Sequence, residues 1–140
     1  MFHVKLTIIQ SKAIEEYWKN YKHYLKEADF RYWEVLQKQN HDTNTGGGRS
    51  SNISDTTGSS AVKLMNDVRY QHLKRVTKAV ESVYETLDEE AKDIVNARYW
   101  NEDGVIEWVD MKDYFFISRA TVYRIRENII NKTAEKLGWL

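Results

Sequence analysis

Near its C-terminus the chain reads Ile117-Ser118-Arg119-Ala120-Thr121-Val122-Tyr123-Arg124-Ile125-Arg126-Glu127-Asn128-Ile129-Ile130. Ser118 is a residue type that caps helices, because its side-chain oxygen accepts an early backbone N–H group. Apolar residues then recur at spacings of three and four, which places them on one helix face: Val122, Ile125, Ile129 and Ile130. The arginines lie on or beside the opposite face. The segment therefore predicts a capped helix with an apolar inner face and an arginine-rich outer face.

A shorter amphipathic segment, 108–116, lies directly upstream. A short helix, a tight turn and a capped helix are the pattern of a helix-turn-helix, whose second helix enters the DNA major groove. The alternative is an ordinary surface helix whose arginines are merely solvated. Charge favours DNA, because 118–136 holds five basic and two acidic residues, whereas 87–117 holds nine acidic and three basic ones.

Composition narrows the class of protein. The 140 residues have a formal net charge of zero, which argues against polyanion binding by the whole surface but leaves room for a local basic patch. The chain has no cysteine, and its four histidines lack ligand spacing, so we expect no metal, no cofactor and no catalytic site. It also has no proline to interrupt helices, and we expect an all-α protein. Without a long apolar run or a signal-peptide pattern, we expect a cytoplasmic protein with no membrane partner.

The N-terminal part predicts one long amphipathic helix. Thr7 and Gln10 form a capping-box pattern, and apolar or aromatic residues then recur every three or four positions: Ile14, Tyr17, Tyr21, Leu25, Ala28, Tyr32 and Leu36. Such an aromatic stripe must be covered. It packs either into the core of its own chain or against a second copy, and the second interpretation predicts a homodimer.

Residues 40–60 change in character, with many Gly, Ser, Asn and Thr residues and little to bury, and we expect a flexible linker there. Its glycines look like a phosphate loop but lack the Lys-Ser or Lys-Thr ending. We expect Arg49 in this segment to be an auxiliary phosphate contact. The expected division is an N-terminal support or oligomerisation segment (1–39), the linker (40–60), a connecting helix (61–86) and a DNA-binding domain (87–140).

Residues that cap or end helices predict the remaining helix boundaries. Ser59 or Ser60 would cap a helix running to about Tyr84, whose basic residues Lys74, Arg75 and Lys78 are either solvated or auxiliary phosphate contacts. A helix over 87–100 would begin with acids that suit its dipole and would act as caps rather than catalysts. Gly138 would end the final helix.

The C-terminal part also carries a set of short motifs: Leu87-Asp88-Glu89-Glu90, Ile94-Val95, Arg98-Tyr99, Ile117-Ser118, Thr121-Val122-Tyr123-Arg124 and Ala134-Glu135-Lys136-Leu137-Gly138. In these motifs the region resembles region 4 of bacterial sigma factors. The whole chain resembles the RinA/ArpU group of phage-encoded transcriptional regulators, which combine N-terminal helices, a polar linker and a sigma-like helix-turn-helix.

The resemblance implies an activator of phage or prophage late genes in a Gram-positive host, binding double-stranded promoter DNA and working with host RNA polymerase. It implies that Arg119, Ala120, Tyr123 and Arg124 face bases. It implies that Ser118, Thr121 and Arg126 hold phosphates, and we add Lys112 and Lys132 as auxiliary contacts. One departure is Phe116, which stands near a turn where many helix-turn-helix units have a small residue.

Three other functions fit parts of the pattern. A small DNA-packaging subunit also joins a helix-turn-helix to an oligomerising helix, and solution mass would distinguish it. A nuclease or recombinase would need an acid cluster or a nucleophile with basic partners, which we do not find. A polymerase-binding adaptor would use the same helices without touching DNA, and a gel shift would separate it from a DNA-binding regulator.

Overall fold

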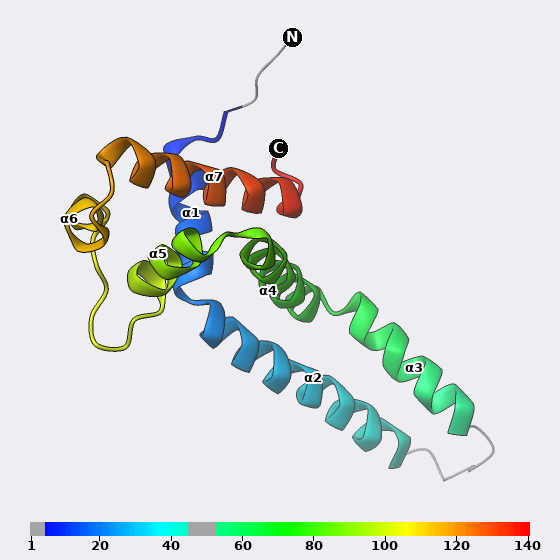
Figure 1. Cartoon of the computed structure of the whole chain (residues 1–140). Helices are drawn as coiled ribbons and strands as arrows, with labels where there is room; N and C mark the ends of the chain where they lie inside the picture. The colour runs from blue at the N-terminus through cyan, green and yellow to red at the C-terminus, as the bar shows by residue number, and fades with distance from the viewer. Residues whose placement is uncertain (1–4, 45–52) are drawn as a thin grey trace. The chain divides into compact units, whose positions relative to one another are not determined.

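The computed structural model describes the backbone of residues 5–44 and 53–140, and the side chains of 5–37 and 58–140 (Figure 1). The protein is all-α, as expected. Its helices are α1 (Ile8–Lys19), α2 (Tyr21–Asn44), α3 (Ile53–Asn66), α4 (Val68–Thr86), α5 (Glu89–Tyr99), the 3₁₀ turn η2 (Trp108–Asp110), α6 (Met111–Phe115) and α7 (Arg119–Leu137).

The chain divides into two compact units. The first comprises residues 1–21 and 78–140, and we call it the head. The second, the middle unit, comprises residues 22–77. The chain passes from one unit to the other at the start of α2 and within α4.

The head packs α1 and the last turns of α4 together with α5, η2, α6 and α7. Its core contains the fully buried Ile14, Trp18, Ile94, Met111 and Ile129. Trp18 is fixed at its polar end, because its indole N–H donates to the Thr133 hydroxyl at 2.9 Å, 115 positions away. The Thr133 hydroxyl donates in turn to the Ile129 carbonyl at 2.7 Å. Helices α1 and α7, the first and last of the chain, therefore share one core.

This arrangement corrects the expected domain boundaries. We expected 87–140 to be a DNA-binding domain separate from 1–39, but α1 belongs to the same unit as α7. The physical reason is size: a unit of 54 residues buries a smaller fraction of its surface than a larger one, so its core alone would be marginal. Trp18 and Ile14 supply the missing apolar surface.

The expected long N-terminal helix is also interrupted. The capping box of Thr7 and Gln10 is present as predicted, but α1 ends at Lys19, and the backbone of its C-cap residue Asn20 (φ −99°, ψ 15°) leaves the helical region. The Asn20 amide donates to the Glu16 carboxylate at 3.1 Å. The aromatic stripe is thus divided, with Ile14 and Tyr17 in the head and Ala28, Tyr32 and Leu36 in the middle unit.

The middle unit differs from the expected linker and connecting helix. Helix α2 extends to Asn44 and α3 begins at Ile53, so helices cover both ends of the expected 40–60 linker, and residues 45–52 lie outside the described residues. The predicted cap at Ser59 or Ser60 lies inside α3. The expected single helix breaks instead at Asp67, whose carboxylate accepts the Tyr70 N–H at 2.8 Å.

Asp67 also anchors α4 to α2. Its two carboxylate oxygens accept from the Arg31 guanidinium at 2.9 and 2.6 Å. Hydrogen bonding to Arg31 lowers the pKa of Asp67 from 3.8 to about 2, although burial opposes this shift. Tyr32 of α2 and Tyr70 of α4 pack beside the pair with ring centroids 6.2 Å apart.

Candidate nucleic-acid interface

The short helix, turn and capped helix follow each other as the sequence predicts. Ser118 caps α7, its hydroxyl accepting the Thr121 N–H at 3.1 Å. The helix ends at Gly138, whose left-handed backbone (φ 79°) lets its N–H reach the last carbonyls. Upstream, η2 begins at Trp108 and leads into α6. Residues 108–137 therefore have the element order of a helix-turn-helix.

Phe116 forms the turn between α6 and α7. Its backbone is left-handed (φ 56°, ψ 44°), and its side chain is 93% exposed. Left-handed backbone places a Cβ close to the following carbonyl, which is why small residues are usual there. The departure noted in the sequence is thus resolved: the turn keeps its tight geometry with a bulky residue, which gains little from packing.

The N-terminal half of α7 presents its outer face to solvent. Ser118, Arg119, Ala120 and Arg124 are exposed, and Tyr123 is half-buried. The Arg119 guanidinium lies 5.3 Å from the Tyr123 ring centroid. Arg119, Ala120, Tyr123 and Arg124 are the residues expected to face bases. Together with the capping Ser118, we call them the recognition face. The opposite side of the helix is anchored by the buried Val122 and Ile129, as expected, while Ile125 is half-buried.

Two of the expected phosphate contacts are engaged within the protein. The Thr121 hydroxyl lies 2.8 Å from that of Ser118 and is half-buried. Arg126 differs more clearly from the expectation, since its guanidinium donates to both oxygens of the Glu15 carboxylate at 2.9 and 3.3 Å. Its charge is thereby matched inside the head, and we remove Arg126 from the proposed DNA contacts.

Glu15 is the residue that sequence reasoning missed. Besides Arg126, its Oε1 atom accepts the Trp108 indole N–H at 3.0 Å and the Tyr99 hydroxyl at 3.2 Å. One half-buried carboxylate of α1 therefore joins α5, η2 and α7. Burial and then the neighbouring Glu15 raise the pKa of Tyr99 well above 10. No local pattern reveals this cluster, because Glu15 and Arg126 lie 111 positions apart.

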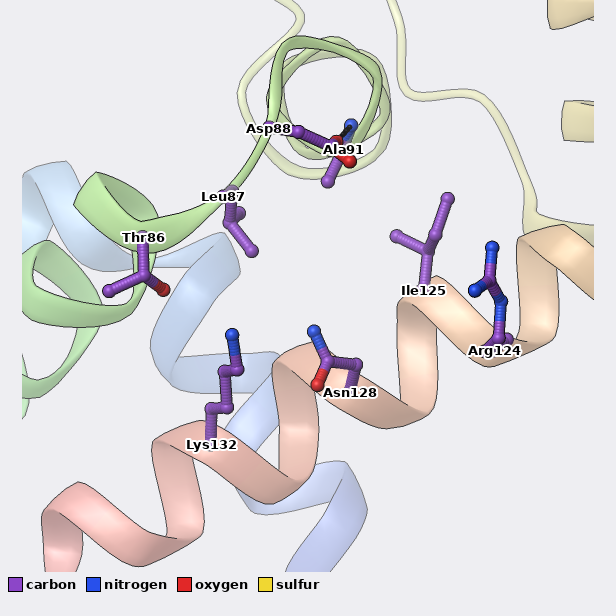
Figure 2. A pocket seen from close by; sticks show the side chains of 8 residues that line it. All are labelled: Thr86, Leu87, Asp88, Ala91, Arg124, Ile125, Asn128 and Lys132. Carbon is purple, nitrogen blue, oxygen red and sulfur yellow. Dashed lines mark hydrogen bonds between the residues drawn. The ribbon is translucent and has the colours of Figure 1, made fainter.

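A groove lies between α7 and the start of α5 (Figure 2). Its volume is about 400 Å³. One wall comes from α7 and the other from the end of α4 and the first turn of α5; the lining residues are Thr86, Leu87, Asp88, Ala91, Arg124, Ile125, Asn128 and Lys132. The structure thus brings the expected contacts Arg124 and Lys132 into one groove.

The remaining expected contacts lie elsewhere. Lys112 is exposed on α6. Arg49 lies outside the described residues, and so does the glycine-rich segment that precedes it. Across the described ranges 5–44 and 53–140, no group of three or more His, Cys, Asp or Glu side chains is arranged to hold a metal ion. Within the same ranges, none of the helices has the length and apolar character needed to span a bilayer.

Comparison with known protein families identifies the family of the chain. A family profile described as "Protein of unknown function (DUF722)" matches residues 12–135. The chain belongs to this family. The DUF722 match begins within α1 and ends near the last turn of α7, so it covers both parts of the head and the middle unit. No curated protein matches the chain, and no solved structure does.

Proposed function

We propose that the protein is a sequence-specific DNA-binding transcription regulator and not an enzyme. The observation that carries this proposal is the recognition face: a capped helix follows a tight turn, and its first turns hold exposed arginines that the core does not use. Arg119 and Arg124 bind base edges in the major groove, with Ala120 and Tyr123 between them. Ser118 and Lys112 contact the backbone on either side of the turn.

The biological setting follows from the resemblance to sigma region 4 and to the RinA/ArpU regulators. On that basis the protein activates late genes of a phage or prophage in the bacterial cytoplasm, and it contacts host RNA polymerase at its promoter. The neutral net charge supports a regulator that binds a defined site, since the chain lacks the overall positive charge that would hold it on any DNA.

A selection experiment tests DNA binding directly. Duplexes recovered from a random pool by the full-length protein should share a sequence, and the protein should bind that sequence far more tightly than unrelated DNA. Arg119→Ala and Arg124→Ala should each weaken binding roughly 5- to 150-fold, as expected for one lost bidentate guanine contact. Recovery of no enriched sequence, with no DNA bound at moderate salt, would contradict the proposal and favour a polymerase-binding adaptor.

We further propose that the protein forms a dimer. Tyr21 of the aromatic stripe is already bound within the head, where its hydroxyl donates to Glu81 at 2.6 Å. The exposed aromatic surface is instead on α2, where Phe30 is 67% and Trp33 is 55% exposed. Large exposed aromatics three positions apart mark one face of a helix for protein contact.

The alternative function is DNA recognition in a small DNA-packaging subunit, which the same exposed face of α2 favours. The two differ in assembly, because the proposed regulator is a dimer and a packaging subunit forms a ring of many copies. Light scattering of the full-length protein separates them: a mass of about twice 16.6 kDa supports the regulator, and a ring mass supports the packaging subunit.

A further inference from the structure

The groove between α7 and the start of α5 has more positive than negative charge among its lining residues. Arg124, Asn128 and Lys132 are each four positions apart, so they project from one side of α7 toward α5 (Figure 2). Within the described parts of the chain, Arg124 and Lys132 make no ion pair. Arg126, on the adjacent side of the same helix, is by contrast paired with Glu15.

The opposite wall offsets only part of this charge. Asp88 lines the groove, but its carboxylate accepts the Ala91 N–H at 2.8 Å and is therefore directed at the first turn of α5. The other acids of that turn, Glu89 and Glu90, are exposed and do not line the groove. The lining thus holds two cationic side chains and one amide against a single carboxylate, so its net charge is positive and the groove suits an anion.

The position of the groove indicates which anion. Arg124 belongs both to the recognition face and to the groove, so the groove continues the recognition face along α7 toward its C-terminus. A helix lying in the major groove passes close to the flanking phosphates, and phosphate contacts fix the register of a protein on DNA without reading its sequence. Acidic protein segments share the charge, but they do not share this continuity with the recognition face.

We propose that this groove holds a phosphate of the DNA backbone, bound by Lys132 and Asn128. Arg124 stands at the end of the groove nearest the recognition face, between the phosphate and the bases. The apolar floor of Leu87 and Ile125 limits the water that competes for the phosphate. This inference rests on the proposed DNA-binding function and adds a second, sequence-independent site to it.

The test compares three variants that each change the charge by one unit: Lys132→Gln and Asn128→Asp in the groove, and Lys12→Gln as the control. Lys12 is exposed on α1 of the same head. Affinity for the selected duplex and for unrelated DNA is measured over a range of KCl concentrations. Lys132→Gln should weaken both by the same factor and reduce the slope of log K against log salt by about one. Asn128→Asp should weaken both, and Lys12→Gln should match wild type.

Phosphate ethylation interference gives the second measurement. Ethylation of one particular phosphate should block wild type and the Lys12→Gln control, yet no longer affect Lys132→Gln. Groove variants that match the control in affinity, salt slope and interference pattern would overturn the inference while leaving DNA binding intact. It would equally be overturned if inorganic phosphate stabilised wild type against unfolding while DNA binding ignored both variants, since the groove would then be a small-anion site.

Discussion

At the scale of single residues, the cluster around Glu15 shows how much of the head depends on one carboxylate. Glu15 accepts hydrogen bonds from three side chains that come from three different elements. Its own side chain is 16% exposed, and that of Arg126 is 33% exposed. Interactions with a charged group in this degree of burial are stronger than surface pairs, because water competes less for the donors.

Glu15→Ala should therefore destabilise the head by about 2–3 kcal/mol, because it leaves a guanidinium and an indole N–H without an acceptor. Glu15→Gln retains an acceptor oxygen and should cost less than Glu15→Ala. Urea unfolding of the full-length variants measures both values. Equal stability of the two variants would show that the acceptor is unimportant.

The Asp67 carboxylate makes the stability of the folded chain depend on pH. Its pKa is about 2 in the folded chain and 3.8 as the reference value, so the folded state holds its proton less tightly than the unfolded state. The ion pair with Arg31 thus contributes its full stabilisation above about pH 4, and loses it as pH falls toward 2. The shift corresponds to about 2 kcal/mol.

Asp67→Asn should therefore lower stability much more at pH 7 than at pH 2, where about half of the folded wild-type chains have a neutral Asp67. Thermal unfolding followed from pH 7 to pH 2 provides the comparison, with Asp29→Asn as a control on the exposed side of α2. A difference between wild type and Asp67→Asn that stayed constant down to pH 2 would argue against the assignment.

At the scale of elements, most caps were predictable and the breaks were not; the cap expected at Ser59 or Ser60 lies inside α3. Thr7, Asp88, Ser118 and Gly138 carry local signals, and each lies at the helix end that the sequence predicts. Asn20 and Asp67 interrupt helices without glycine or proline. Asn20 bonds the Glu16 side chain of its own helix, four positions back, whereas Asp67 binds Arg31 of α2, 36 positions away. Tertiary hydrogen bonds of this kind are absent from the spacing of apolar residues.

The turn before α7 offers a stabilising substitution. Phe116→Gly removes the Cβ from a left-handed backbone and should stabilise the head by about 0.5–1 kcal/mol, because Phe116 buries almost nothing that the change would lose. Phe116→Ala keeps the Cβ and should leave stability unchanged. The melting temperature of each variant is compared with that of wild type. A melting temperature of Phe116→Gly below that of wild type would mean that the ring packs in solution.

At the scale of the whole molecule, the two ends of the chain fold together. The sequence indicated the class and the helix-turn-helix, but it placed Ile14 and Trp18 in a separate segment. The same pattern of aromatic residues serves equally for a core, a dimer or a second domain. Long-range contacts such as the hydrogen bonds from Trp18 to Thr133 and from Arg126 to Glu15 distinguish these uses, and they join residues too far apart for any sequence period to relate.

A fragment of residues 87–140 should consequently fail to unfold cooperatively, because it lacks α1. In the full-length protein Trp18→Ala should destabilise the head by about 3–5 kcal/mol, the usual cost of removing a fully buried tryptophan. Circular dichroism melting measures both. Cooperative unfolding of the fragment at the temperature of the full-length head would show that α1 is dispensable.

The proposed dimer is also tested at the scale of the whole molecule. Phe30→Glu combined with Trp33→Glu should convert a dimer into a folded monomer, because both side chains are exposed and their loss leaves the buried Ala28 and Val35 in place. Light scattering gives the mass, and circular dichroism confirms the fold. A wild type that is already monomeric at micromolar concentration would remove the dimer from the account.

The central claim is that the recognition face of α7 reads bases in the major groove, and one measurement addresses it directly. Guanines of the selected duplex are replaced one at a time by 7-deazaguanine, which removes only the N7 acceptor that arginine binds from the major groove. Wild type should lose affinity at particular guanines, and Arg119→Ala or Arg124→Ala should each become insensitive at one of them. If wild type binds every 7-deaza duplex as tightly as the parent, α7 does not read the major groove through these arginines, and the account is contradicted.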